Sequence, residues 1–187
     1  MKLIGLTGPG AGGKLAVTQR LVQNHNFANL RFDDPARDML ASLLQLGREH
    51  VDDLLLDHHW RETPLSETGV SPRQLLQSLT TDWGRRLNRD LWIALLRKRL
   101  AFITDDLPYE YEGVVISDVR CENEARFIRE QGVLVHVARP ELAPVVPLNG
   151  EAVKFHYRDQ ILLNLGNALV DRYTDHLVES ICAQRVA

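Results

Sequence analysis

Three features of the sequence predict an α/β fold with a doubly wound, mainly parallel sheet. An apolar run at the N-terminus leads into a glycine-rich loop within residues 2–15. Two later runs, 113–118 and 133–137, are continuously apolar, which is typical of strands buried on both faces of a parallel sheet. Segments with helical periodicity lie between these runs, and such alternation of strands and helices indicates parallel α/β architecture.

The N-terminal run reads as a strand, a phosphate-binding loop and a helix. Residues 8–14, GPGAGGK, match the pattern G-x-x-x-x-G-K. In that pattern the glycines let backbone N–H groups turn toward phosphate oxygens, while the lysine reaches the β and γ phosphates. The N-terminus of the following helix adds its partial positive charge. The residues expected to bind the phosphates of ATP are Gly8, Gly10, Gly12, Gly13, Lys14 and Leu15.

The position after Lys14 departs from the pattern. A Ser or Thr hydroxyl that binds Mg²⁺ is expected there, and this chain has Leu15 followed by Ala16. The sequence therefore supports phosphate binding more strongly than metal-assisted catalysis. The alternative is a glycine-rich turn between a strand and a helix that binds no ligand.

Size and composition fit one domain, 1–187, with room for a small helical insertion and a short lid. The chain is 44% hydrophobic and 25% charged, as is ordinary for a globular protein. A net charge of −3 argues against a general basic surface, so stable binding to nucleic acid is not expected. A mononucleotide needs only a few local arginines and is not excluded.

Cysteine usage and hydropathy predict a cytoplasmic protein. Cys121 and Cys182 match no metal-binding or disulfide spacing, and we expect both to remain thiols in a reducing compartment. No apolar run approaches the ~20 residues that a membrane span requires. The N-terminus reads as a core strand from Lys2 onward and not as a signal peptide.

In the first quarter of the chain, periodicity predicts a helix from Gly13 to about Asn24, a strand at Phe27–Phe32 and a helix at Pro35–Leu46. Asp34, directly before Pro35, is the expected N-cap of the second helix. The side chains expected to face inward are Ala16, Val17, Leu21 and Val22 in the first helix and Met39, Leu40, Leu43 and Leu44 in the second.

The middle of the chain is predicted to be helical. One short helix is expected within 47–69, followed by a loop at 60–70. The sequence 71–74, SPRQ, is a capping box that starts a helix at 72–85. A further helix is expected at Leu91 to about Phe102, with Asp90 as its cap. Its expected inward side chains are Leu91, Leu95, Leu96 and Ile103.

In the last part of the chain the turn-like segment 104–112 precedes the strand at 113–118. A helix is expected at 122–130, because Gly132 stops it before the strand at 133–137. An irregular, proline-bearing segment covers about 139–159. A last strand at 160–164 and an amphipathic helix at 167–182 close the fold.

Ligands of open α/β sheets bind at the carboxyl ends of the strands, and charged residues follow two of the predicted strands there. Asp33 and Asp34 follow the second strand, where an acid could orient a phosphate acceptor or hold a hydrated metal. Arg37 could clamp a phosphate of that acceptor. The alternatives are that Asp34 only caps a helix and that Arg37 is a solvated surface arginine.

Asp118 and Arg120 follow the buried strand at 113–118. An aspartate that ends such a strand beside a phosphate loop commonly binds a metal-bound water, so Asp118 is the best candidate to position Mg²⁺. Arg120 is the best candidate for a bidentate contact with a phosphate. The alternative is a capping acid and a surface arginine.

Two further groups are less distinctive. Gln77, Trp83 and Arg85 place polar groups around a tryptophan near a helix end, which could be a pocket wall or core packing. His58 and His59 are adjacent, with no other His or Cys nearby. We interpret them as surface histidines and not as metal ligands.

The order of these motifs resembles that of the bacteriophage-type deoxynucleoside monophosphate kinases, a P-loop kinase family. The resemblance covers most of the chain. The matching stretches are the loop at 8–14, FDDPAR at 32–37, PRQLLQSLTTDWGR at 72–85, Trp92, VVISDVRCENE at 114–124 and VHVARP at 135–140.

The resemblance implies a P-loop, NMP-kinase-like fold that transfers the γ-phosphate of ATP to a deoxynucleoside monophosphate with Mg²⁺. It implies an acceptor-site region at about 47–104 and a lid at about 139–159. It further implies a possible homodimer, located in the host cytoplasm if the chain is encoded by a phage. By this resemblance, the ATP phosphates are bound by Gly8, Gly13 and Lys14, and the acceptor is bound by Asp34, Arg37, Gln77, Trp83, Arg85 and Arg120. The catalytic residues it implies are Lys14, Asp34, Asp118 and Arg120. It also implies that Asp118 binds the metal and that the lid begins at Arg139.

Two stretches depart from the family pattern. Leu15-Ala16 stands where the family has a polar residue and a hydroxyl, and 144–159 matches poorly although it includes His156. The sequence therefore leaves two alternatives to this kinase. One is a nucleotide-binding or regulatory protein that has lost or weakened catalysis. The other is a P-loop kinase with a different acceptor, such as dephospho-coenzyme A or a modified base in DNA.

Overall fold

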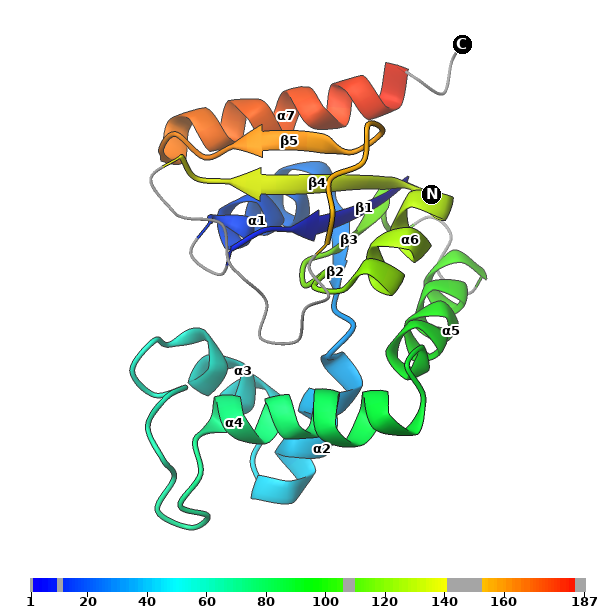
Figure 1. The fold of residues 1–187 in the computed structure, drawn as a ribbon. Helices are drawn as coiled ribbons and strands as arrows, with labels where there is room; N and C mark the ends of the chain where they lie inside the picture. The colour runs from blue at the N-terminus through cyan, green and yellow to red at the C-terminus, as the bar shows by residue number, and fades with distance from the viewer. Residues whose placement is uncertain (1, 10–11, 106–109, 141–152, 184–187) are drawn as a thin grey trace. The chain divides into compact units, whose positions relative to one another are not determined.

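The structure is a computed structural model that describes residues 2–9, 12–105, 110–140 and 153–183. The chain forms two compact units (Figure 1). One consists of Met1–Arg31 and Arg99–Ala187 and is called the sheet unit. The other, Phe32–Lys98, is called the helical unit.

The sheet unit is built on five parallel strands in the order β2-β3-β1-β4-β5, which confirms the predicted α/β fold with a mainly parallel sheet. The register places Leu3 of the first strand opposite Val114 and Leu6 opposite Val135. The strands are β1 (Lys2–Thr7), β2 (Phe27–Leu30), β3 (Gly113–Ile116), β4 (Val133–Ala138) and β5 (Gln160–Leu163).

Helices cover both faces of this sheet, so the doubly wound arrangement is confirmed (Figure 1). The helices are α1 (Lys14–His25), α6 (Glu122–Gln131) and α7 (Asn167–Ala183). Ile4 and Leu6 of β1 belong to one core cluster with Val17 of α1 and Val170 of α7. The alternate residue Gly5 points to the other face, where a Cβ would lie 2.7 Å from the Ile128 side chain. Gly5 therefore lets α6 approach the sheet closely.

Two details of the predicted sheet unit were wrong. The second strand ends at Leu30, not at Phe32, because its neighbour β3 ends opposite Leu30 and offers no further partner. Val22 was expected to face inward, but it is 40% exposed. Val17 and Leu21 form the buried stripe of α1, and Asn26 ends the helix in a left-handed conformation with φ 53°.

The helical unit contains four helical segments and the start of a fifth helix. These are α2 (Asp34–Leu44), α3 (Arg48–Leu56), α4 (Pro72–Gln77), the π-helix η1 (Ser78–Arg85) and α5 (Leu91–Asp105), which continues into the sheet unit. The short helix expected within 47–69 is α3, and the following loop consists of turns, as predicted. Buried side chains of α5 include the predicted Leu96 and Ile103.

The predicted start of α2 and part of its predicted inward face were wrong. Asp34 is the first helical residue and Asp33 is the N-cap, whose side chain makes no capping hydrogen bond. Met39 and Leu43 are 37% and 61% exposed. Leu40 is buried as predicted, and it is accompanied by Ala36 and Ala41, whose small side chains let this helix pack closely.

The helix predicted at 72–85 is present, but its second half is a π-helix. The capping box is confirmed: Ser71 Oγ accepts a hydrogen bond from the Gln74 backbone N–H, and Gln74 Oε1 accepts one from the Ser71 N–H. From Ser78 the helix widens, and the Trp92 indole N–H donates to the Thr80 carbonyl at 2.9 Å. Among the described residues, no helix combines the length and the apolar character that crossing a membrane requires.

Candidate functional site

The glycine-rich loop joins β1 to α1, and its glycines are required by its geometry. Gly8 and Gly13 have φ values of +130° and +98°, which side chains rarely allow. A Cβ would lie 2.2 Å from the Val137 carbonyl oxygen at Gly8 and 2.0 Å from Asn164 Nδ2 at Gly13. At Gly8 and Gly13 the loop therefore has a tight backbone that excludes side chains, as phosphate binding needs. Gly10, predicted to bind ATP, lies outside the described residues.

Lys14 begins α1, and its side chain folds back over the loop. Its ammonium donates hydrogen bonds to the carbonyl oxygens of Gly8, at 2.6 Å, and Pro9, at 2.8 Å. Burial lowers the pKa of Lys14 to about 8, and the positive charge of Arg120 adds to this effect, while Asp118 opposes it. Arg120 and Asp118 therefore lie close enough to Lys14 for their charges to act on its ammonium.

Leu15 offers no oxygen where the motif usually has a hydroxyl, and its side chain is 48% exposed. Thr18, one helical turn further on, is buried, and its hydroxyl donates to the Lys14 carbonyl at 2.8 Å. That hydrogen bond holds the Thr18 hydroxyl against its own helix. The first turn of α1 thus supplies a lysine and backbone N–H groups in the absence of the usual hydroxyl.

The segment after β3 holds Asp118 at the carboxyl edge of the sheet. The Ser117 N–H donates to the Leu30 carbonyl at 3.2 Å, and the Val119 N–H donates to the Leu6 carbonyl at 3.1 Å. The chain therefore crosses between β2 and β1 at this point, with the largely buried Asp118 in between. Because β1 leads directly into the phosphate loop, this crossing fixes Asp118 near the loop.

Glu124 fixes the backbone at Arg120 and Cys121. Its buried carboxylate accepts hydrogen bonds from the N–H groups of Arg120, at 2.8 Å, and Cys121, at 3.0 Å. The exposed Arg120 side chain thus starts from a rigid backbone. Glu124 was not predicted to have a role, although its place three residues after the N-cap Cys121 is the sequence signal of such a cap.

A magnesium ion would meet one protein carboxylate at this site. No group of three or more metal-ligating side chains lies together anywhere in the described ranges. Mg²⁺ does not need such a cage, since it usually keeps several waters and binds one or two carboxylates together with phosphates. Asp118 fits this mode of binding, whereas Leu15 contributes nothing to it.

Asn164, which the sequence analysis missed, holds the phosphate loop from the end of β5. Its Nδ2 donates to the Gly12 carbonyl at 3.1 Å, and its backbone N–H donates to the Ala138 carbonyl at 2.8 Å. Its Oδ1 accepts from the N–H of Gly166, which has φ +120°. An Asn followed by a glycine turn at a strand end was the signal available for it.

A buried ion pair fixes the segment that leads into β5. Arg129 of α6 binds Asp159 through two hydrogen bonds of 2.8 Å and Glu122 through one of 2.6 Å. His136 Nε2 lies 2.9 Å from the same Asp159 carboxylate. Of the predicted lid at 139–159, residues 141–152 lie outside the described residues, and Arg139 follows β4 directly with an exposed side chain.

In the helical unit, Arg37 is neither free nor solvated. Its side chain is 11% exposed, and its guanidinium donates to Asp33 at 2.8 Å and to Asp52 at 2.7 Å. Burial alone would lower the pKa of Arg37, but these two carboxylates outweigh burial and raise it. The alternative interpretation of Arg37 as a surface arginine was therefore wrong.

Arg48 joins this cluster and was not predicted. It donates to Asp34 at 2.6 Å and to Asp52 at 3.1 Å, and it also pairs with Asp38. The Asp34 carboxylate, expected to cap α2, thus binds an arginine instead. Arg48 begins α3, and its reach across to α2 depends on tertiary packing that the local sequence does not reveal.

The residues predicted around Trp83 lie on α4 and the π-helix η1. Gln77 is exposed, Arg85 is half-buried and Trp83 is 45% exposed. Trp92 beside Trp83 is buried, and the centroids of the two tryptophan rings lie 6.5 Å apart. Trp83 is therefore a partly exposed aromatic surface, and the core role that was its alternative belongs to Trp92.

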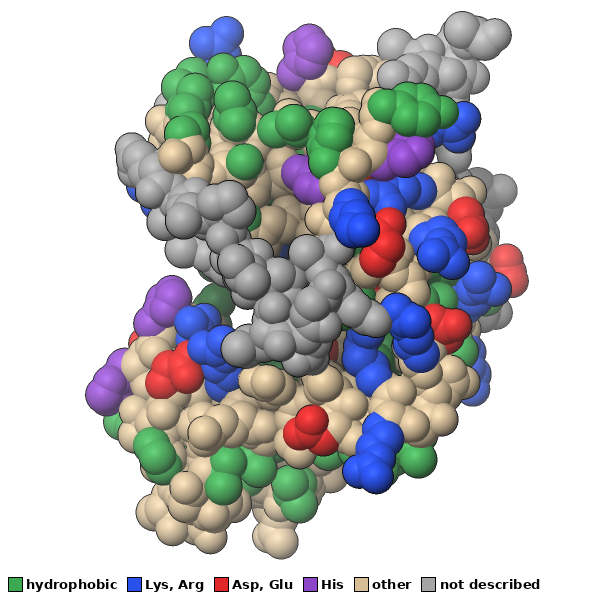
Figure 2. All heavy atoms as spheres, viewed as in Figure 1, with side chains coloured by type: hydrophobic (Ala, Val, Ile, Leu, Met, Phe, Trp, Pro, Cys, Tyr) green, Lys and Arg blue, Asp and Glu red, His purple; other side chains and the backbone are tan. Residues whose placement is uncertain are grey.

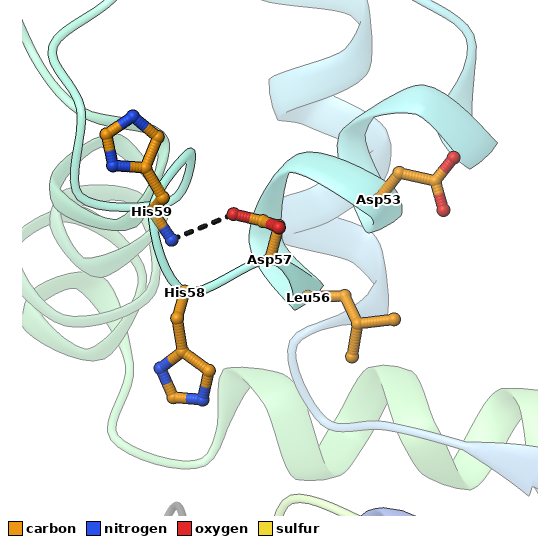
Figure 3. Close-up of a pocket in the computed structure, with 5 residues that line it drawn as sticks. All are labelled: Asp53, Leu56, Asp57, His58 and His59. Atoms are coloured by element: carbon orange, nitrogen blue, oxygen red, sulfur yellow. Dashed lines mark hydrogen bonds between the residues drawn. The ribbon is translucent and has the colours of Figure 1, made fainter.

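The two adjacent histidines line an open hollow of about 540 Å³ in the helical unit (Figure 3). Figure 3 shows the rings of His58 and His59 pointing away from each other, with Asp57 to their right. The Asp57 carboxylate accepts hydrogen bonds from the backbone N–H groups of His59 and Trp60. The Asp57 carboxylate thus stabilises a turn. Both histidines are exposed, as the sequence predicted.

Fold and loop together define the sheet unit as an α/β domain with a glycine-rich phosphate-loop motif. The whole chain is similar in structure to the crystal structure of TT1252 from Thermus thermophilus, with a TM-score of 0.51 and 96% of each chain covered. At 16% sequence identity this likeness shows the fold. It supports the predicted α/β architecture along the full length.

Sequence comparison gives a more specific relative. A protein of Acanthamoeba polyphaga mimivirus that carries the name "Putative deoxynucleotide monophosphate kinase" is 28% identical over 191 residues. The match covers 97% of this chain and 96% of the mimivirus protein. No family model matches the chain.

Proposed function

We propose that this protein is a nucleotide kinase that transfers the γ-phosphate of ATP to a deoxynucleoside monophosphate. The observation that carries the proposal is the grouping of Lys14, Asp118 and Arg120 beside the phosphate loop. Phosphoryl transfer asks a protein mainly for positioning and charge stabilisation, which two cations and one acid can supply. The full-length similarity to the mimivirus protein supports this choice of reaction.

The donor phosphates would bind at the loop, where Gly8, Gly12, Gly13 and Lys14 form the cradle and Gly10 completes the motif. Lys14 already lies over the loop and donates to two backbone carbonyls. On binding ATP its ammonium would exchange these carbonyls for the β and γ phosphate oxygens. Leu15 would contribute its backbone at the start of α1.

The transfer itself would rest on Asp118 and Arg120. Asp118 would hold a hydrated Mg²⁺, which neutralises charge on the phosphates when bound. Arg120, fixed through its backbone by Glu124, would contact the transferred phosphoryl group with its guanidinium. Arg139, at the start of the proposed lid, would add a further positive charge.

The acceptor would bind to residues of the helical unit. Arg37 would meet the monophosphate, since Asp33 and Asp52 hold its guanidinium in one orientation and leave it N–H groups to donate. Asp34 would orient the acceptor, and Trp83 would offer a face on which a base can stack. Gln77 and Arg85 would complete this surface.

The enzyme would act in the cytoplasm, where its nucleotide substrates are. A homodimer is compatible with this proposal, and neither a membrane nor a nucleic-acid partner is needed for it.

One observation favours a second candidate. Leu15 exposes an apolar side chain where catalysis usually employs a metal-binding hydroxyl. A nucleotide-binding or regulatory protein without turnover would keep the loop and Lys14 and could dispense with that hydroxyl.

Two measurements on the purified chain separate these candidates. In a thermal-shift screen a specific ligand at a hundredfold excess over its Kd should add ~2.7 kcal/mol of stability. The screen includes ATP, the four deoxynucleoside monophosphates and dephospho-coenzyme A. Product analysis with Mg²⁺-ATP should then show a deoxynucleoside diphosphate. Stabilisation by dephospho-coenzyme A alone would redirect the proposal to another acceptor, and ATP binding without any product would select the regulatory protein.

A further inference from the structure

Helix α3 brings two charged side chains to the proposed acceptor-binding residues, although neither was predicted to have a role. Arg48 begins this helix and Asp52 follows four residues later, so the two lie on the same side of α3. Arg48 Nε donates to Asp52 Oδ2 at 3.1 Å. That side of α3 faces α2, the helix that carries Asp34 and Arg37, because both charged side chains bind residues of α2.

Arg48 holds Asp34 at two of its atoms. Arg48 Nη2 donates to Asp34 Oδ1 at 2.6 Å, and Nη1 donates to the Asp34 backbone carbonyl at 3.3 Å. Nη1 also donates to the carboxylate of Asp38, one helical turn further along α2. A guanidinium is planar and presents its donors in a fixed arrangement. One side chain of α3 therefore fixes both the backbone and the carboxylate of Asp34.

Asp52 extends this arrangement to Arg37. Its Oδ1 accepts a hydrogen bond from Arg37 Nη1 at 2.7 Å, while its Oδ2 accepts the one from Arg48. One carboxylate thus bridges two guanidinium groups. The contacts join Asp34 and Arg37, the two proposed acceptor-binding residues of α2, through α3.

These contacts differ from ion pairs on the protein surface. Exposed pairs fix little, because water and side-chain motion compete with them. Figure 2 shows such pairs as neighbouring blue and red side chains on the helical unit. The Asp34 side chain, in contrast, is only 10% exposed, and Arg48 and Asp52 are half-buried. Burial alone would lower the pKa of Arg48, but its hydrogen bonds to Asp34 and Asp38 outweigh burial and raise it.

We propose that Arg48 is a positioning residue of the acceptor site. It holds Asp34 directly and Arg37 through Asp52, and it needs no contact of its own with the acceptor. This inference rests on the proposed kinase function, which assigns Asp34 and Arg37 to the acceptor. A deoxynucleoside monophosphate would meet a carboxylate and a guanidinium whose arrangement is set before it binds. Such preorganisation lowers the cost of binding.

Steady-state kinetics of Arg48→Met test this role, with Mg²⁺-ATP and whichever of the four deoxynucleoside monophosphates the wild-type chain phosphorylates fastest. Methionine keeps an unbranched side chain and removes every guanidinium donor. We expect the KM for the acceptor to rise at least about tenfold while the KM for ATP stays unchanged. Arg73→Met is the matched control, since Arg73 forms an exposed pair with Glu62 in the same unit, and it should change neither KM.

Arg48→Lys separates the arrangement of donors from charge alone, and it tests the proposal even if Arg48→Met does not fold. Lysine keeps the positive charge, but a single ammonium cannot reproduce the planar set of donors. We therefore expect the acceptor KM of Arg48→Lys to stay raised, again by about tenfold. A wild-type acceptor KM in Arg48→Lys would overturn the proposal.

A double variant distinguishes positioning from a general loss of stability. Partial unfolding lowers the apparent kcat and leaves both KM values unchanged, because the molecules that remain folded bind substrate normally. If Arg48 acts through Asp34, Arg48→Met should raise the acceptor KM by at most about threefold in an Asp34→Ala background. Effects of the two substitutions that multiply in full would overturn the proposal.

The remaining outcomes separate this inference from the proposed function. An acceptor KM that stays within about twofold of wild type in Arg48→Met, or an equal rise in Arg73→Met, would overturn the role of Arg48 alone. If the wild-type chain forms no deoxynucleoside diphosphate, the proposed function fails and the role of Arg48 fails with it.

Discussion

Leu15 is the single residue on which the proposed catalysis depends most. The remainder of the loop agrees with phosphate binding, from the positive φ values of Gly8 and Gly13 to the position of Lys14. Leu15 removes one metal contact, and about half of its side chain is exposed, so a smaller residue there should cost little packing. A change at this position can therefore be interpreted as a change in chemistry.

We predict that Leu15→Ser raises kcat about tenfold, because the new hydroxyl adds a ligand for Mg²⁺ beside the phosphates. Leu15→Ala is the control, since it shortens the side chain without adding an oxygen. Steady-state kinetics at saturating ATP and acceptor give both values. Equal rates for the two variants would show that the missing hydroxyl does not limit the reaction.

Glu124 should act on the reaction by fixing the backbone of Arg120. Replacing it with Gln removes the charge that strengthens two hydrogen bonds, and we expect kcat to fall about tenfold with little change in the KM for ATP. Glu130→Gln, at an exposed position of the same helix, should leave kcat unchanged. An increase in KM alone would argue that Glu124 affects ATP binding and not the position of Arg120.

Single residues also show where sequence patterns fail. Asp34 was predicted as an N-cap from its place before Pro35, yet its carboxylate binds Arg48, which begins a separate helix. Arg37 could be interpreted from its neighbours only as a ligand or as a solvated side chain. Its burial between Asp33 and Asp52 depends on how α2 and α3 pack. Contacts between elements are thus the part of the site that local sequence does not predict.

Among the elements, the π-helix η1 depends on Gly84. A Cβ at this position would lie 2.2 Å from the ring of Trp92. Trp92 in turn donates a hydrogen bond to the Thr80 carbonyl of the π-helix. π-helical turns are frequent at functional sites, and this one presents Trp83, the proposed base-stacking residue.

Gly84→Ala should therefore destabilise the protein by about 2 kcal/mol, since the added methyl group must displace the Trp92 ring. Gly47→Ala is the matched control, because its φ is −64° and a Cβ there meets nothing within 4 Å. Urea unfolding followed by circular dichroism measures both. A Gly84→Ala variant as stable as Gly47→Ala would contradict the proposed packing of Trp92.

The connection between α6 and β5 depends on the buried Asp159. Burial alone would raise the pKa of Asp159, but hydrogen bonds from Arg129, His136 and the His156 backbone outweigh it and lower that pKa to about 2. A folded-state pKa below the ordinary value of 3.8 means that the charged carboxylate stabilises the fold. This contribution is present above about pH 4 and is lost as the pH falls toward 2.

We expect Asp159 to contribute about 2 kcal/mol at neutral pH through this shift. Asp159→Asn should lower the free energy of unfolding at pH 7 by at least that amount and flatten its decrease between pH 4 and pH 2. Asp175, whose pKa is also lowered to about 2, titrates equally in both proteins and cancels in the comparison. Identical pH profiles would show that Asp159 is not held as a charged group.

At the scale of the whole molecule, the sheet was the most predictable part. Its buried strands are apolar runs bounded by glycine or charge, and the loop motif fixed the order of strand, loop and helix. The π-helix and the exposed face of α2 were not predictable, because helical periodicity does not reveal which side of a surface helix meets the core. Asn164 was missed because its glycine turn marks only a strand end, and its partner Gly12 lies 152 residues away in the sequence.

The proposed kinase reaction is tested most directly by a single-turnover experiment. The purified chain is mixed with Mg²⁺, ATP labelled at the γ-phosphate and each of the four deoxynucleoside monophosphates. We predict that label appears in a deoxynucleoside diphosphate, that Lys14→Ala reduces its rate at least roughly a hundredfold, and that Lys98→Ala, at an exposed lysine, does not. Bound ATP without label in any diphosphate, or equal transfer by Lys14→Ala, would contradict the proposal.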